Sequence, residues 1–593
     1  MLGGGRDLRG VSASRPVSFN QIDQSNVIDY WLFKAMQENG ITPASKSNDY
    51  EFLRRVYYDL SGRPPTLEKL AEFVNNSDPA KRAKLVDDLI GSPEFIDKWT
   101  MFFGDHFKNV DNNGQINRFA EGRQAFYSYL KDAVTTNKKY DVMAREMITA
   151  LGDNNWDHGT LNFILGGFMQ GGPAQDTYDL LAQTVAEKFL GIAHENCLLC
   201  HDGRRHLDSL SVWGKAETRM GAYQLASFFS KLTVPFPRTY PNPDNRNVYK
   251  SVVGENPRNA DYPLGSTTGN RSPRTIAGSV RNVAPAYPFG TNPKPAANEN
   301  YRTALARFVT SDIQFARAAV NYIFKQFFVR GIVDPPNQFD LARLDPTNPP
   351  PDPWTLQPTN PYLLDALAKD FQQNKFDIRD LIRKIVLSDA YQLSAQYDGE
   401  WKPEYEKYFA RKFVRRLWGE EIVDTLVQTS NVRNNFTFTM QTPLVQGMQV
   451  QAGIVPFSMQ LPQTRGQGGG AMVSFLDSFL RGNRIDEDRK DEGSVPQVLN
   501  LLNDSFVHVR TRATGSGASA TIARRLLDKY TGSNNNLLIN ELFLTLLNRP
   551  ATDDEVLTAT IALNQAVSIP LRQAKVEDLV WSAFNKVDFA FNY

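Results

Sequence analysis

The chain has 593 residues, of which 41% are hydrophobic and 22% are charged, which is typical of a globular protein too long for one hydrophobic core. Its 66 basic and 65 acidic side chains nearly cancel, and no dense basic run occurs, so we expect no nucleic-acid partner. No stretch of about 18 apolar residues is present, so we expect no membrane span.

Residues 1–18 are rich in Gly, Arg and Ser and predict an N-terminal arm. Such an arm can pack on the body of the chain or on a neighbouring subunit, so a homo-oligomer or a larger assembly is one expectation. The arm has no apolar core of the kind that a signal peptide needs. If the protein is exported, we expect the sequence to be that of the mature chain or to begin downstream of the true start.

Residues 19–234 predict a helical domain. Asn48 can cap a helix, with Glu51 at the third helical position, and Gly62 is suited to end it. Thr66 then begins the next helix after a pair of prolines. Further helices are expected at about 80–91, 93–108, 118–134, 140–151 and 176–192.

Residues 235–299 predict an irregular connector, which can include short strands. Eleven prolines fall in this stretch, together with many Asn, Gly and Arg, and periodicity is weak. A segment of this length without helices is usually functional or wrapped over another surface.

Residues 300–593 predict a second helical domain, so the expected fold class is mainly α, with two helical domains and a proline-rich connector. Helical periodicity returns after Asn300. Helices are expected at about 361–374, 377–388, 404–409, 418–430, 471–480, 495–512, 519–530 and 535–547.

The only two cysteines, Cys197 and Cys200, are followed directly by His201. The spacing Cys-x-x-Cys-His is the attachment signature of a c-type haem. The two thiols add across the haem vinyl groups, and the histidine is the proximal ligand of the iron. The motif therefore predicts one covalent haem c.

Two other readings of this motif remain open. The cysteines can be free thiols on a surface turn or a reversible disulfide. They can also form part of a zinc site in which His201 and His206 complete a Cys₂His₂ set, although a second cysteine pair is missing. We favour the haem.

Basic residues follow the motif. Arg204 and Arg205 can pair with haem propionates, because arginine binds carboxylates through two hydrogen bonds, or they can be solvated charges. His206 lies five residues beyond His201, so the chain would have to cross the porphyrin edge in that span to reach the opposite face of the iron. We expect His206 to support a propionate or the surroundings of the iron, or to be a solvated loop residue.

The sixth iron ligand is left open by the sequence. Met220 is far enough from the motif to fold back onto the iron, but its position also suits core packing. His106 ends an aromatic helix and His158 lies in a polar segment. An open sixth position would favour catalysis over electron transfer. His206, His194 and Met169 are further possible ligands of the iron.

Several stretches resemble the planctomycete cytochrome-like family that pairs an N-terminal domain of unknown function, carrying Cys-x-x-Cys-His, with a C-terminal partner domain of unknown function. The N-terminal resemblance is carried by Asp49 to Thr66, Leu85 to Phe95, Phe189 to Gly191 with the cysteine motif, and Tyr223 to Phe229. The C-terminal resemblance is carried by Phe315 to Asn321, Arg330 to Pro336, Ile385 to Tyr391, Leu499 to Phe506 and Leu547 to Pro550.

This resemblance implies an exported, mainly helical haem protein and supplies no substrate. The chain departs from the family pattern at three positions. Gly203 stands where the family commonly has a second histidine, Phe102 where it has a histidine, and Tyr322 where it has an arginine. Roles that rest on those side chains do not transfer to this chain.

The sequence thus predicts a periplasmic or extracellular mono-haem c-type cytochrome in electron transfer or haem-based redox chemistry. Its partner would be a redox protein or a small redox substrate. Electron transfer by a single haem needs far less protein than this chain provides. The alternative is therefore a structural or assembly protein in which the haem mainly stabilises the fold. No hydrolase or phosphate-loop motif is present, and whether the protein is an enzyme is left undecided.

Overall fold

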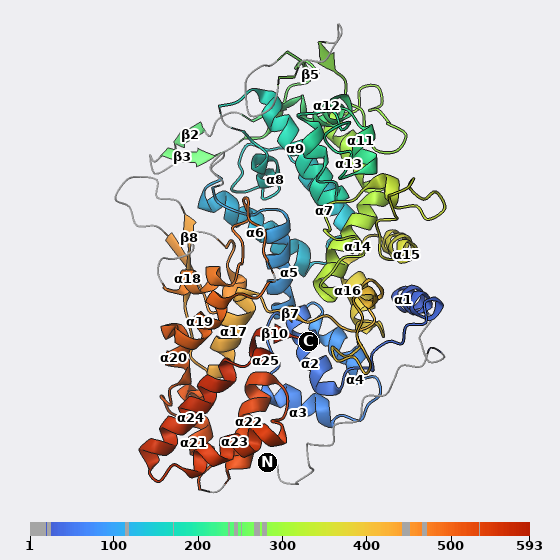
Figure 1. The fold of residues 1–593 in the computed structure, drawn as a ribbon. Coiled ribbons are helices and arrows are strands. Elements are labelled where there is room, and N and C mark those ends of the chain that lie inside the picture. Colours follow the sequence, from blue (N-terminus) through green and yellow to red (C-terminus); the bar gives the residue numbers. More distant parts are fainter. Residues whose placement is uncertain are drawn as a thin grey trace.

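The computed structural model confirms a mainly helical fold with small two-stranded sheets (Figure 1). Within the described part of the chain, no helix is long and apolar enough to cross a membrane. The predicted arm, residues 1–18, lies outside the described residues. The structure describes residues 19, 25–112, 118–169, 171–234, 238–241, 247–250, 252–265, 273–274, 281–441, 451–464, 471–490, 492–532 and 534–593.

Helix α2 (Asp49–Ser61) begins and ends at residues that the sequence marks as caps. Asn48 Oδ1 accepts a hydrogen bond from the backbone N–H of Glu51, at 2.9 Å, and Gly62 ends that helix with a φ of 68°. The N-terminal helices are α1 (Val27–Glu38), α2 (Asp49–Ser61), α3 (Leu67–Asn75), α4 (Lys81–Leu89), α5 (Pro93–His106), α6 (Phe119–Thr135) and α7 (Tyr140–Ile148).

The next helices carry the chain to the cysteine motif and away from it. They are α8 (Leu161–Gly166), α9 (Ala174–Leu190), the single turn α10 (Glu195–Leu198), α11 (Val212–Ala216), α12 (Arg219–Ala226) and the 3₁₀ turn η2 (Ser227–Phe229).

The connector contains short antiparallel strand pairs where its residues are described, as the sequence allowed. Strand β4 (Gly254–Glu255) pairs with β1 (Leu232–Thr233), which lies just before the connector. Within the connector, β2 (Arg238–Pro241) pairs with β3 (Asn247–Lys250), and β5 (Tyr262–Pro263) pairs with β6 (Asn282–Val283).

Helices α13 to α17 follow, with 3₁₀ turns and one short strand between them. The 404–409 segment, for which the sequence predicts a helix, is a 3₁₀ helix, η4. The elements are α13 (Tyr301–Ser311), α14 (Ile313–Phe328), η3 (Leu341–Arg343), α15 (Pro361–Gln373), α16 (Ile378–Leu387), η4 (Pro403–Tyr408), β7 (Arg415–Arg416) and α17 (Gly419–Ser430).

The last elements include two more strand pairs, β8 with β9 and β7 with β10. They are β8 (Phe436–Gln441), β9 (Gln451–Val455), η5 (Ser458–Gln460), α18 (Ala471–Ser478), α19 (Val495–Asn503), α20 (Ser505–Thr511), η6 (Gly517–Ser519), α21 (Ile522–Lys529), α22 (Asn535–Leu547), α23 (Asp553–Asn564), α24 (Ile569–Phe584), α25 (Val587–Ala590) and β10 (Phe591–Asn592).

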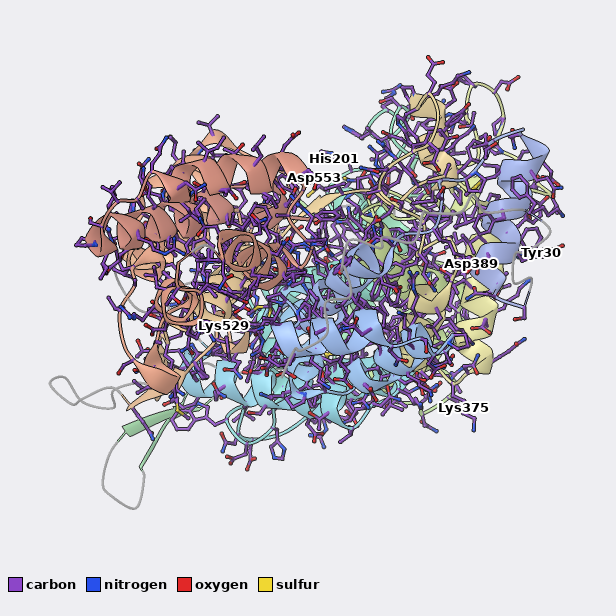
Figure 2. The ribbon with its side chains drawn as sticks, turned by 90° about the horizontal axis from the view of Figure 1, so that it is seen from below. Tyr30, His201, Lys375, Asp389, Lys529 and Asp553 are labelled. Atoms are coloured by element: carbon purple, nitrogen blue, oxygen red, sulfur yellow. The ribbon has the colours of Figure 1, made fainter. Side chains whose placement is uncertain are left out.

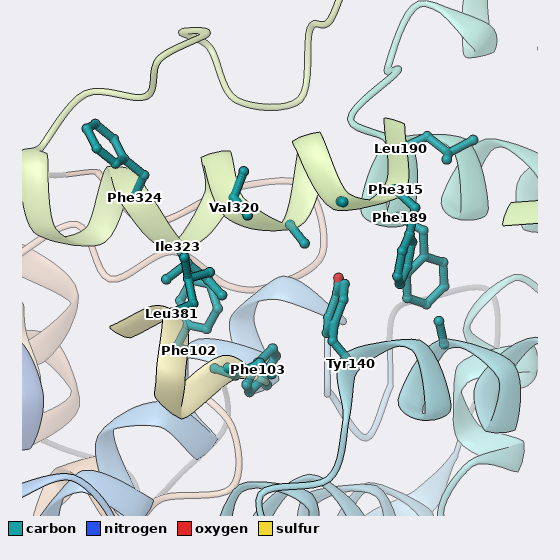
Figure 3. Packing of buried hydrophobic residues seen from close by; sticks show 14 of the residues in the cluster. Phe102, Phe103, Tyr140, Phe189, Leu190, Phe315, Val320, Ile323, Phe324 and Leu381 are labelled. Carbon is teal, nitrogen blue, oxygen red and sulfur yellow. The ribbon is translucent and has the colours of Figure 1, made fainter. Parts of the chain in front are cut away.

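Two hydrophobic cores hold these elements together. The larger core takes side chains from Ile28 to Ala410, with Trp418, Met459 and Leu544 added. Aromatic side chains are prominent in it: the Tyr140 and Phe315 rings stack with their centroids 5.2 Å apart, where α14 crosses over the helices beneath it (Figure 3).

The smaller core lies among the C-terminal helices and takes Tyr58 from α2. The N-terminal helices α2 and α3 contact elements at the other end of the chain, β10 and α22, and Figure 1 shows the blue and red segments side by side. Side chains fill the space between them in the view from below (Figure 2). The two ends of the sequence therefore stabilise one another.

Candidate cofactor attachment site

The turn that carries the cysteines is fixed at its start to a distant loop. Helix α9 ends at Gly191, whose φ of 70° is the left-handed conformation that favours glycine. The backbone N–H of Phe339 then donates to the carbonyl of Gly191, at 2.9 Å, and that of Ala193 donates to the carbonyl of Asn337, at 2.8 Å. The motif is thereby anchored to the 337–339 segment before its first cysteine.

The motif itself divides into buried and accessible residues. Leu198 and Leu199 are buried, at 1% and 0% exposure, whereas Cys197 and His201 are exposed and Cys200 is half-buried. The N–H groups of Cys200 and His201 both donate to the Cys197 carbonyl, at 3.1 Å each. The leucines anchor the turn, and the two thiols and the imidazole remain accessible on it (His201 is labelled in Figure 2).

The loop after the motif explains the departure from the family pattern at position 203. The N–H of Gly203 donates to the carbonyl of Glu217, at 2.9 Å. A Cβ atom at Gly203 would lie 1.7 Å from the carbonyl oxygen of Gly214, far inside any real contact. A histidine therefore does not fit there in this fold. The Asp202 side chain accepts from the N–H of Arg219, at 2.8 Å, which ties the same loop to the start of α12.

The structure brings His206 onto the motif. The rings of His201 and His206 stack with their centroids 4.2 Å apart and an interplanar angle of 21°. Arg204 and Arg205 are exposed beside them, and neither makes an ion pair with a described residue. Their guanidinium groups are accessible to an anionic group at the surface.

Burial perturbs the titratable groups of the turn. Cys197 is exposed, but partial desolvation by the neighbouring protein raises the pKa of its thiol, and the nearby Cys200 adds to this. Burial also raises the pKa of Glu195 to about 8, with a further contribution from Glu217. The pKa of His194 is lowered by burial. Glu195 Oε1 and His194 Nδ1 have no hydrogen-bond partner among the described residues.

The candidate sixth ligands lie in different places. Met220 is half-buried on α12, a helix in contact with α10. His106 Nε2 lies 3.1 Å from the carbonyl oxygen of Lys188, and burial lowers the pKa of His106 to about 3. His158 is exposed and contacts the 152 position. Met169 is half-buried, and its N–H donates to Thr177 Oγ1 at 3.1 Å.

The other two departures from the family pattern meet around His106. Phe102 stacks on the His106 ring at 6.0 Å, and Tyr322 meets it edge-on at 4.6 Å. The Tyr322 hydroxyl donates to the carbonyl of Glu187, at 2.8 Å. Positions that are far apart in the sequence thus form one aromatic cluster beside the end of α9.

A buried polar chain beneath the motif was missed by the sequence analysis. The Tyr223 hydroxyl donates to the carbonyl of Leu199, at 3.4 Å, and its ring stacks on that of Tyr262 at 4.9 Å. The Tyr262 hydroxyl donates to Asp179, at 2.8 Å, and Arg274 donates to the same carboxylate, at 2.6 Å. Members of this chain come from α9, α12 and the connector, so no local pattern reveals it.

The donor set of the turn fits a covalently attached haem. Two accessible thiols lie three residues apart on a single turn, and the following imidazole is also accessible. Within the described residues, no group of three or more His, Cys, Asp or Glu side chains is placed to hold a metal ion by itself.

Comparison with known proteins gives two matches. Residues 27–232 match PSCyt2, a protein of unknown function (DUF1549), and residues 301–563 match PSD1, a protein of unknown function (DUF1553). No curated protein and no solved structure matches the chain.

Proposed function

Because the chain carries these two domains of unknown function in the order of the two-domain planctomycete family, we propose that it is an exported mono-haem c-type cytochrome. It would work in electron transfer or in haem-based redox chemistry. The observation that carries the proposal is the turn on which Leu198 and Leu199 are buried while Cys197, Cys200 and His201 remain accessible.

Each accessible residue of the turn has a role in this proposal. Cys197 and Cys200 would form the two thioethers, and His201 would be the proximal ligand. Arg204 and Arg205, exposed and without ion pairs to described residues, would pair with the propionates. When bound, the haem supplies an iron that can gain or lose one electron.

The positions of the other donors suggest how the site is completed. The His206 ring stacks on the His201 ring, so it would lie on the same side of the haem as His201. We therefore assign His206 to positioning the proximal imidazole. Met220 is the candidate sixth ligand whose helix, α12, contacts α10. His106, already within hydrogen-bond distance of Lys188, and the exposed His158 are less suitably placed.

The proposed cofactor also implies where the protein works. Because c-type haem is attached outside the bacterial cytoplasm, we propose a periplasmic or extracellular location. The partner would be a redox protein or a small redox substrate that reaches the exposed face of the turn.

A pyridine haemochrome assay on the exported protein tests the assignment. We expect a c-type spectrum and haem that stays with the denatured chain. Alkylation of both Cys197 and Cys200 in the exported protein would contradict it, because thioether sulfurs do not react with the reagent.

The alternative, a structural role for the haem, is supported by how the turn is anchored. Asp340 accepts from the N–H groups of Val212 and Trp213, at 2.7 and 2.9 Å, and the 337–339 segment holds the end of α9. A group attached to the turn would therefore affect the stability of the contact between residues 27–232 and residues 301–563. A haem spectrum that fails to respond to dithionite and ferricyanide would favour this alternative over electron transfer.

A further inference from the structure

A second polar site lies away from the cysteine motif, where the two matched regions meet. Asp59 of α2 accepts from Arg415, at 2.9 and 3.1 Å, and from the Tyr391 hydroxyl, at 2.9 Å. Arg415 also donates to Glu421, at 2.7 and 3.0 Å. Lys98 of α5 donates to Glu421 as well, at 2.7 Å. All five side chains are buried.

A cavity of about 30 Å³ opens beside this network. One probe-sized water needs about 10–15 Å³ on this measure, so the cavity has room for more than one water or for a small ion. Among its described lining residues are Asp59, Lys98, Trp99, Val329 and Arg415.

Two of the residues that line the cavity carry hydrogen-bond donors that are not fully used. The indole Nε1–H of Trp99, a residue that is 2% exposed, has no acceptor among the described residues. The Lys98 ammonium has three N–H groups, and Glu421 is its hydrogen-bond acceptor in the structure. The face of the Trp418 ring lies 3.0 Å from Lys98 Nζ and provides no conventional acceptor.

The charged residues that line the cavity are mostly cationic. Lys98, Lys325 and Arg415 carry positive charge there, and Asp59 is the one carboxylate among the described lining residues. Burial lowers the pKa of the Lys98 ammonium to about 8, and the neighbouring guanidinium groups of Arg415 and Arg489 lower it further. A buried charge is stable when it is paired.

A strained residue also lines the cavity. Val329, directly after α14, has a φ of 68° and a ψ of −32°, a conformation that β-branched residues rarely adopt. Backbone strain of this kind is concentrated at ligand-binding positions. Val329 is therefore held by its surroundings at the wall of the cavity.

We propose that this cavity binds a small monovalent anion of about the size of chloride, held by Lys98 Nζ and the Trp99 indole N–H. The anion would lie among the cationic side chains of the lining and accept hydrogen bonds from the unused donors. Because the cavity lies between α2 and α5 of one matched region and α14, Arg415 and Trp418 of the other, the anion would stabilise their contact. This site is independent of the haem.

Thermal unfolding of the full chain at constant ionic strength, with chloride replacing gluconate, tests the proposal. The unfolding midpoint should rise with chloride and then saturate, because a ligand of the folded state stabilises it. Lys98→Met should abolish the chloride-dependent rise. Trp99→Phe replaces the indole by a smaller aromatic ring that has no N–H, so it should weaken chloride binding at least about tenfold. Lys69→Met, at an exposed lysine of α3, is the matched control and should leave the rise unchanged.

Crystals grown in bromide provide the direct observation. We expect an anomalous bromide peak within contact distance of Lys98 Nζ and the Trp99 indole nitrogen. Equal midpoints in chloride and gluconate, together with no bromide peak in the cavity, would overturn the proposal and show that water fills it. If Lys98→Met does not fold, Trp99→Phe and the bromide peak decide the question.

Discussion

The His206 ring lies face to face with the His201 ring, with centroids 4.2 Å apart and planes inclined by 21°. We predict different consequences of losing each ring. His201→Ala removes the proposed proximal ligand and should strongly reduce the yield of attached haem and alter its absorption spectrum. His206→Ala should keep the haem attached. In-gel haem staining and absorbance of the exported protein measure both.

His508→Ala is the matched control for these variants, because His508 lies on α20 and is not among the candidate iron ligands. It should behave as wild type. A His206→Ala protein that loses its haem as completely as His201→Ala would contradict the assignment of His206 to positioning.

The second prediction concerns the close packing at Gly203. Gly203→Ala should lower the free energy of unfolding by about 3 kcal/mol, because its Cβ would lie 1.7 Å from the Gly214 oxygen and the backbone must move. Gly493→Ala is the control, since its Cβ would meet the Phe591 ring at 3.9 Å, an ordinary contact. Urea unfolding of both variants measures the difference, and equal stabilities would refute the close packing.

A third prediction concerns Asp59, which accepts hydrogen bonds from Arg415 and from Tyr391 at the contact between the two matched regions. Asp59→Asn leaves buried cations without their carboxylate and should reduce the free energy of unfolding by about 3–5 kcal/mol. Asp87→Asn breaks an exposed ion pair with Arg383 and should cost less than about 1 kcal/mol. Similar urea midpoints for the two variants would contradict the importance of the Asp59 network.

The fourth prediction is a pH dependence that comes from Glu195, a fully buried residue whose pKa burial raises from 4.5 to about 8. Between these values the folded chain retains a proton that the unfolded chain releases, so the free energy of unfolding falls as pH rises. The fall attributable to Glu195 is at most about 1.4 kcal/mol per pH unit. Stability from this group is fully present below pH 4.5 and is lost as pH approaches 8.

Glu195→Gln should remove that part of the pH dependence, because the amide does not titrate in this range. Urea unfolding at pH 5, 6.5 and 8 is the measurement, with exposed Glu68→Gln as the control. If the wild type and Glu195→Gln show the same slope, Glu195 does not retain its proton in the folded chain.

Local features were predicted well from the sequence because they depend on neighbouring residues. Asn48 and Thr66 cap their helices as expected. The helix predicted over 495–512 is divided, because Asp504 is extended and its side chain accepts from the N–H of Phe506, at 2.8 Å. A residue that can cap a helix can interrupt one, and periodicity alone does not distinguish the two.

The candidate site was predictable only in part, because only some of its residues are neighbours in the sequence. The spacing of Cys197, Cys200 and His201 is local and marks the turn. The chain from Tyr223 through Tyr262 to Asp179 joins residues up to 83 positions apart, and the cavity beside Lys98 is lined by residues from 59 to 418. Such sites arise from packing between distant segments, which one sequence does not encode in any short pattern.

The central claim is tested most directly by the intact mass of the natively exported protein, measured under denaturing conditions and combined with alkylation of free thiols. We predict one haem covalently bound per chain, no alkylation at Cys197 or Cys200, and loss of the bound haem in the Cys197→Ser, Cys200→Ser double variant. A chain with the mass of the polypeptide alone, alkylated at both cysteines, would contradict the haem assignment.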